Sequence, residues 1–169
     1  MKTKITTIIA LLTLSATVFA QKQDSLSNTT ISHSVGFNFG TTTGKGLAYQ
    51  IGINKLSFQI AGHPLIQEQE KHYDVGLSAM YKFRDKKYVD LLTYIAANYI
   101  YNRDEGYQYG ETKAPDIITK KTNMGAGLGF EFDTRNNISF KLLGGYGAYI
   151  SEKSYEIAPS IETSVLYNF

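Results

Sequence analysis

The last nine residues of the chain alternate between two kinds of side chain. Apolar or β-branched side chains occupy every odd position from Ile161 to Phe169, and the even positions are mostly polar. Successive side chains of a β-strand point to opposite faces, so this pattern predicts a strand between an apolar and a polar medium. Because the last residues of a soluble domain usually fray into water, an aromatic end favours a paired strand that faces an apolar phase. A closed barrel in a membrane meets both conditions.

The same segment resembles the C-terminal signal of bacterial outer-membrane β-barrel proteins. That signal is an alternating strand with Tyr third from the end and Phe last, and Tyr167 and Phe169 occupy these positions. The resemblance implies that Tyr167 and Phe169 form an assembly signal, which the barrel assembly machinery of the outer membrane reads.

The N-terminus has the pattern of a secretory signal peptide. Lys2 and Lys4 precede an apolar run, and a small-x-small-like site ends at Ala20. We therefore expect export, cleavage after Ala20, a short periplasmic segment over residues 21–30 and a barrel over residues 31–169. Among the 17 basic and 15 acidic residues, two lysines belong to the signal, which leaves 15 of each. Such a balance gives no net attraction for nucleic acid.

The composition favours strands over helices. The chain has 13 Tyr, 9 Phe and 15 Gly with only 3 Pro, and no apolar run reaches the roughly 18 residues that a spanning helix needs. No cysteine is present, which excludes disulfides and thiolate chemistry. The chain can therefore cross a membrane only with strands in which alternate residues are apolar.

Alternation of this kind recurs in eight segments. They are 32–42, 47–54, 56–61, 73–83, 89–101, 124–132, 138–150 and 157–169. Every second connection is short, whereas His63–His72 and Asn102–Thr122 are longer. Short periplasmic turns and longer external loops are typical of outer-membrane barrels. The sequence predicts an all-β fold, an eight-stranded antiparallel up-and-down transmembrane β-barrel, with a bulge or local opening at Pro159 because proline lacks a ladder donor.

The two faces of these segments differ in volume as well as in polarity. Glycines and polar residues share one face and bulky apolar residues the other, which fits a narrow lumen and a lipid-facing exterior. A soluble lipocalin-like carrier would need the opposite arrangement. Charges inside a narrow barrel need partners. We expect a lumen charge network in which lysines pair with carboxylates, formed by Lys82, Lys141, Asp74, Asp90, Glu131 and Glu162.

Over residues 31–169 the chain resembles small eight-stranded outer-membrane barrels of the OmpA/OmpX type. The resemblance implies insertion into the outer membrane of a diderm bacterium, contact with outer-membrane lipid and lipopolysaccharide, and a narrow polar lumen. The resemblance does not identify a biological task, and we expect a structural or surface-interaction role without catalysis or cofactor. A narrow passive, porin-like channel is the main alternative, followed by a lipid A-modifying enzyme and a soluble carrier.

The segment Asn102–Thr122 is the best candidate for a partner-binding loop. Tyrosines among balanced charges can contact an extracellular protein or glycan, and the candidate residues are Tyr107, Tyr109, Arg103 and Lys113. The alternative is a variable external loop without a dedicated ligand. The only histidines, His33, His63 and His72, form no recognisable nucleophile or metal motif, so we predict neither catalytic nor metal-binding residues.

Overall fold

The computed structural model describes residues 29–66, 70–84, 89–104, 106, 108–109, 112–113, 115–134, 136–152 and 154–169. The predicted signal peptide lies outside them. The strands are β1 (Ile31–Phe39), β2 (Lys45–Ile53), β3 (Leu56–Ile66), β4 (Glu70–Arg84), β5 (Val89–Asp104), β6 (Gln108–Tyr109), β7 (Thr112–Lys113), β8 (Ile117–Asp133), β9 (Ile138–Ser151) and β10 (Tyr155–Asn168).

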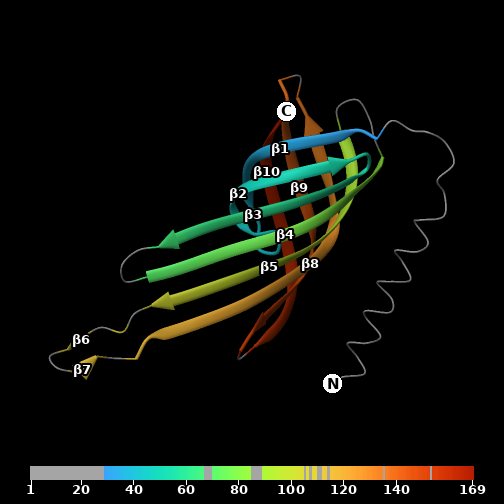
Figure 1. The fold of residues 1–169 in the computed structure, drawn as a ribbon. Helices are drawn as coiled ribbons and strands as arrows, with labels where there is room; N and C mark the ends of the chain where they lie inside the picture. Colours follow the sequence, from blue (N-terminus) through green and yellow to red (C-terminus); the bar gives the residue numbers. More distant parts are fainter. Residues whose placement is uncertain are drawn as a thin grey trace.

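Eight of these strands close into a barrel in the order β1-β10-β9-β8-β5-β4-β3-β2 (Figure 1). Every neighbouring pair is antiparallel, and the barrel closes where β1 pairs with β10, with Val35 opposite Tyr167. The predicted eight-stranded antiparallel up-and-down barrel is thus confirmed. The two remaining strands, β6 and β7, form a small separate hairpin. Among the described residues, no helix is long and apolar enough to span a membrane.

The two faces of the wall follow the alternation in the sequence. Outward-facing Phe37, Leu128 and Ile161 are 54%, 62% and 72% exposed, whereas inward-facing Asn38 and Glu162 are fully buried. An apolar exterior around a polar interior is the reverse of a soluble barrel, and it is stable only if the exterior contacts lipid.

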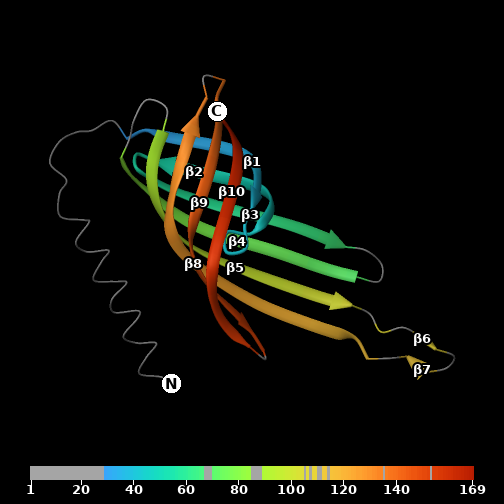
Figure 2. The ribbon, with the colours of Figure 1, turned by 180° about the vertical axis from the view of Figure 1, so that it is seen from behind.

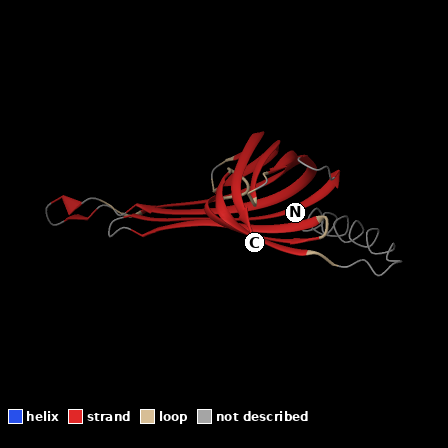
Figure 3. Ribbon diagram, turned by 90° about the horizontal axis from the view of Figure 1, so that it is seen from above, coloured by secondary structure: helices blue, strands red, loops and turns tan. Residues whose placement is uncertain are grey.

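Strand length divides the barrel into a short wall and a long wall. The strands β1 and β2 have nine residues each, whereas β4, β5 and β8 have 15, 16 and 17. Pairing of β3 with β2 ends at Gly62, and pairing of β8 with β9 ends at Lys121. The long strands therefore continue beyond the barrel, as Figures 2 and 3 show. We call this extension the projecting sheet, formed by residues 63–66, 70–73, 101–104 and 117–120.

The projecting sheet corrects the predicted extent of two external connections. The expected loops His63–His72 and Asn102–Thr122 are strand at both ends, and Arg103 lies opposite Ile118 in the β5–β8 ladder. Beyond the membrane both faces of a sheet can be wet, so backbone pairing continues where the alternation of side chains stops. Asn54 and Lys55 form the tight turn between β2 and β3, with Asn54 at a φ of 54°, a value that asparagine tolerates.

Pro159 lies in an uninterrupted part of the β9–β10 ladder, opposite Tyr146. The predicted bulge is therefore wrong for this side of β10. On the other side, pairing with β1 ends at Thr163, so Pro159 needs no donor there. The second predicted alternative, a local opening, is therefore found on the β1 side, and this strand mismatch at the barrel seam accommodates the proline.

Candidate functional site

The connection between β1 and β2 folds into the barrel. We call residues 41–44 of this connection the plug. Glu162 of β10 accepts hydrogen bonds of 2.7 Å from the hydroxyls of both Thr42 and Thr43. The backbone N–H groups of the two threonines also donate to this carboxylate, at 3.1 Å from Thr42 and 3.3 Å from Thr43. All three residues are at most 1% exposed. The carboxylate is therefore stabilised inside the lumen by neutral donors.

Side chains of the facing strands form hydrogen bonds with the plug, and glycines of these strands leave room for it. The carbonyl of Thr41 accepts hydrogen bonds from the amides of Asn123 at 2.8 Å and Asn98 at 3.3 Å. A side chain at Gly76 would collide with the Thr43 backbone, and one at Gly125 with the Thr42 side chain. These two glycines leave the space that the plug occupies. The connection between β1 and β2 is thus short, and it occupies the lumen and not the outer surface.

A charge cluster lies at the opposite end of the lumen. Lys82 pairs with Asp90 at 2.9 Å and with Glu131 at 2.8 Å, and Lys141 lies 3.7 Å from Glu131. Lys141 also donates to Gln50, a residue that the sequence analysis did not select. Of the predicted lumen charges, the structure brings these four together.

The other two predicted lumen charges lie elsewhere. Glu162 holds the plug, and Asp74 of β4 is 2% exposed and accepts the backbone N–H of Lys45 at 3.3 Å. Both carboxylates therefore bind backbone or hydroxyl donors near the plug end of the lumen.

Successive inward side chains of β5 show how completely the lumen is filled. Asp90 belongs to the charge cluster, and Asn98 bonds the plug. Between them, Leu92 and Tyr94 pack with Met80 and Leu143 in a buried apolar cluster. The Tyr94 hydroxyl lies 3.1 Å from that of Ser160. Charges, apolar side chains and the plug thus follow one another along the barrel axis.

The predicted assembly signal completes the barrel seam. Tyr167 and Phe169 are 51% and 69% exposed on the outer surface. The Phe169 N–H donates to the carbonyl of His33 at 2.9 Å, and the two rings stack with centroids 6.1 Å apart. Recognition of this strand by an assembly machine stays a prediction.

Of the predicted partner-binding residues, Arg103 lies near the end of β5 in the projecting sheet. Arg103 pairs with Asp116 at 2.6 Å, which joins the end of β5 to the residue before β8. Tyr107 and the side chains of Tyr109 and Lys113 lie outside the described part of the chain. Nearby, Ile117 and Ile118 are 64% and 48% exposed. These two isoleucines were not predicted as surface residues of a sheet, because they fall within the segment Asn102–Thr122 that was expected to be a loop.

The histidines occupy separate places. His33 contacts the Tyr49 hydroxyl at 2.8 Å near the barrel seam. His63 and His72 lie at the base of the projecting sheet with ring centroids 6.1 Å apart, and His72 bonds Asn102. Within the described residues, no group of three or more His, Cys, Asp or Glu side chains could hold a metal ion.

A closed antiparallel barrel with an apolar exterior and a polar, filled interior pairs the backbone of its neighbouring wall strands while facing lipid. The architecture is that of an outer-membrane β-barrel. No protein-family model and no curated protein sequence matches the chain.

Several solved structures are similar to the chain at low sequence identity. The N-terminal β-barrel domain of Pseudomonas aeruginosa OprF is 14% identical with a TM-score of 0.47, covering 82% of this chain and 96% of that one. The attachment invasion locus protein Ail of Yersinia pestis is 12% identical with a TM-score of 0.49, covering 82% and 95%. Neisserial surface protein A is 18% identical with a TM-score of 0.40, covering 84% and 98%.

Proposed function

We propose that the protein is a non-catalytic outer-membrane barrel that anchors the projecting sheet as a contact surface for an extracellular protein or glycan. The observation that carries this proposal is the continuation of four paired strands beyond the barrel wall. A barrel whose only role was structural, within the membrane, would not need this ordered extension. We place the projecting sheet outside the cell and the Asn54-Lys55 turn in the periplasm.

The projecting sheet has two free edges that suit a partner. Residues 63–66 have no β2 neighbour, and residues 117–120 have no β9 neighbour. An exposed edge offers unpaired backbone groups to an added strand. The exposed Ile117 and Ile118 point to opposite faces of the second edge, so a partner there gains apolar contact on either face.

The contents of the lumen support this role over that of a passive channel. The plug is bonded to Glu162, and the apolar and charge clusters follow beneath it. An open, water-filled path would require all three to move. A lipocalin-like carrier is also disfavoured, because its ligand cavity would need an apolar interior.

Trimming the β5–β8 part of the sheet tests the proposal. In the variant, a short Gly/Ser turn replaces residues 103–118 and leaves the Asn102–Thr119 pair intact. Cells that display the intact or the trimmed protein are compared for adhesion to panels of immobilised glycans and extracellular proteins. We expect both proteins to show a heat-modifiable band on gels and only the intact one to adhere. Equal adhesion by a folded, trimmed protein would contradict the proposal.

A further inference from the structure

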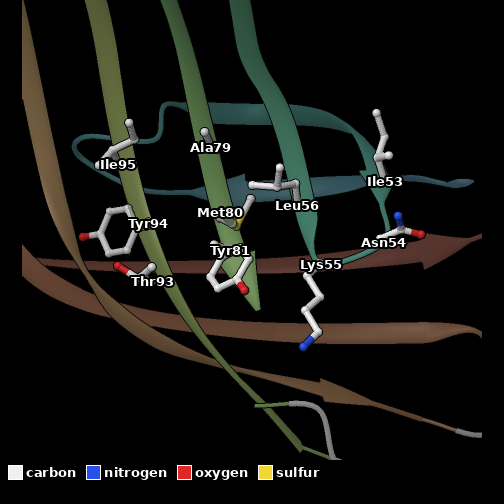
Figure 4. Close-up of a pocket in the computed structure, with 10 residues that line it drawn as sticks. All are labelled: Ile53, Asn54, Lys55, Leu56, Ala79, Met80, Tyr81, Thr93, Tyr94 and Ile95. Atoms are coloured by element: carbon white, nitrogen blue, oxygen red, sulfur yellow. The ribbon is translucent and has the colours of Figure 1, made fainter. Parts of the chain in front are cut away.

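A groove lies on the outer wall of the barrel, beside the turn between β2 and β3. Its volume is about 860 Å³, within the range of about 300–1,000 Å³ that small-molecule sites occupy. Figure 4 shows the side chains around it. Those used below are Ile53, Lys55, Leu56, Ala79, Thr93 and Ile95.

The register of the strands places this groove on the lipid-facing side. Ala79 lies opposite Ile95, and it shares the outward face of the wall with Thr93. These two small side chains leave a depression, which the larger Ile53, Leu56 and Ile95 border. Ile53, Leu56 and Ile95 are 40%, 46% and 57% exposed, so the border is apolar and accessible. A groove of this kind fits an extended hydrocarbon chain.

One end of the groove carries a cation. Lys55 is exposed in the turn, and Figure 4 shows its side chain extending away from Leu56, beyond the turn. This end is opposite the projecting sheet, because β2–β3 and β3–β4 connections lie at opposite ends of β3. The order along the wall is therefore a positive charge at the membrane interface and an apolar groove deeper in the bilayer. A phospholipid has the complementary order of phosphate and acyl chain.

We infer that this groove binds one acyl chain of a phospholipid of the periplasmic leaflet, with the lipid phosphate against Lys55. The inference rests on the proposed placement of the projecting sheet outside the cell. It differs from general lipid contact around the barrel, because it assigns one lipid to one position. At other positions of the outer surface, bulky side chains such as Leu47 and Leu77 leave less room for an acyl chain.

Native mass spectrometry of the purified protein tests the site. Dioleoyl phosphatidylglycerol is the probe, and dioleoylglycerol, which has the same chains without phosphate, is the comparison. Ala79→Leu fills the groove. Ala97→Leu is the matched control, because Ala97 is also outward-facing and exposed but lies between Leu77 and Met124, away from the groove. Lys55→Gln removes the cation alone.

We expect the unaltered protein and Ala97→Leu to retain one phosphatidylglycerol. Ala79→Leu should lower this retention roughly tenfold, since its side chain displaces about two buried methylenes. Lys55→Gln should weaken retention of phosphatidylglycerol and leave that of dioleoylglycerol unchanged. Equal retention by Ala79→Leu and Ala97→Leu would overturn the site, and so would a lipid-free dimer, which would show that a second copy covers the groove.

A further variant and a folding measurement distinguish failure of the lipid site from failure of the proposed function. Thr93→Leu fills the same groove from β5 and replaces Ala79→Leu if that variant does not fold. Heat-modifiability is measured on every sample. A folded barrel without a retained lipid overturns only the lipid site. An unaltered protein that forms no barrel in phospholipid vesicles overturns the proposed function, and the lipid site with it.

Discussion

The carboxylate of Glu162 on β10 accepts the Thr42 hydroxyl at 2.7 Å inside the barrel, although 120 positions separate the two residues. This contact turns a surface connection into an internal one. It also explains how a carboxylate can be fully buried in the lumen, since hydroxyl and backbone donors surround it.

Removal of this carboxylate should release the plug. Glu162→Ala leaves the buried donors of Thr42 and Thr43 without their acceptor, so we expect a loss of about 3 kcal/mol in the free energy of unfolding. Urea titration in lipid vesicles, followed by circular dichroism and by the gel shift of the folded band, measures it. The exposed Glu156, on the same strand, provides the control variant Glu156→Ala. Equal stability of the two variants would contradict a structural role for the plug.

The charge cluster should behave as a coupled unit. Glu131→Leu leaves the buried Lys141 without its carboxylate, so we expect a loss of about 3–5 kcal/mol in the free energy of unfolding. The double variant Glu131→Leu with Lys141→Met should recover part of this loss, because no buried charge then lacks a partner. A double-mutant cycle by urea titration gives the coupling energy. Strictly additive losses would show that the two residues do not interact.

A positive charge on the lipid-facing wall should destabilise the barrel according to its depth. Leu128 and Ile118 both lie on β8 at even positions, but only Leu128 lies within the barrel. Leu128→Arg should cost roughly 2–4 kcal/mol in the free energy of unfolding, as expected near the bilayer midplane. Ile118→Arg, in the projecting sheet, should cost much less. Similar losses for both would argue against a membrane boundary between these residues.

The terminal strand should matter for assembly more than for the final fold. Phe169→Glu removes the predicted signal but keeps the backbone hydrogen bond from position 169 to His33. We expect reduced outer-membrane levels in cells, whereas refolding of the purified protein into vesicles should continue. Immunoblots of membrane fractions and gel shifts of refolded protein measure the two. Normal membrane levels of the variant would contradict the assembly role.

The sequence predicted the barrel because lipid imposes a strict pattern on spanning strands. The alternation that ends at Phe169 recurs in each strand of the wall, and the observed faces follow it. The projecting sheet was not predicted, because the pattern that lipid imposes does not extend beyond the membrane. Around Arg103 and Ile118 no apolar phase selects one face, so the side chains do not alternate while the backbone still pairs.

The plug and the charge pairs depend on relationships that a linear pattern does not contain. In the sequence, Thr42 and Thr43 resemble an ordinary polar turn. The only signal of their burial is the small size of residues on distant strands, such as Gly76 and Gly125. Lys82 and Glu131 belong to β4 and β8, which are separated by β5 in the barrel. The two side chains meet because the curved wall directs both into the lumen, and not because their strands are direct neighbours.

The proposed function requires a membrane boundary that crosses β8, with the projecting sheet in water and the barrel wall in lipid. Because the chain has no cysteine, single cysteines for spin labels can be placed along β8 without background. In vesicles, accessibility to oxygen should peak at Met124, Ala126, Leu128 and Phe130, and accessibility to a water-soluble nickel reagent should dominate at Ile118 and Lys120. Labels at Met124 and Leu128 that are accessible to the nickel reagent instead of oxygen would contradict the account.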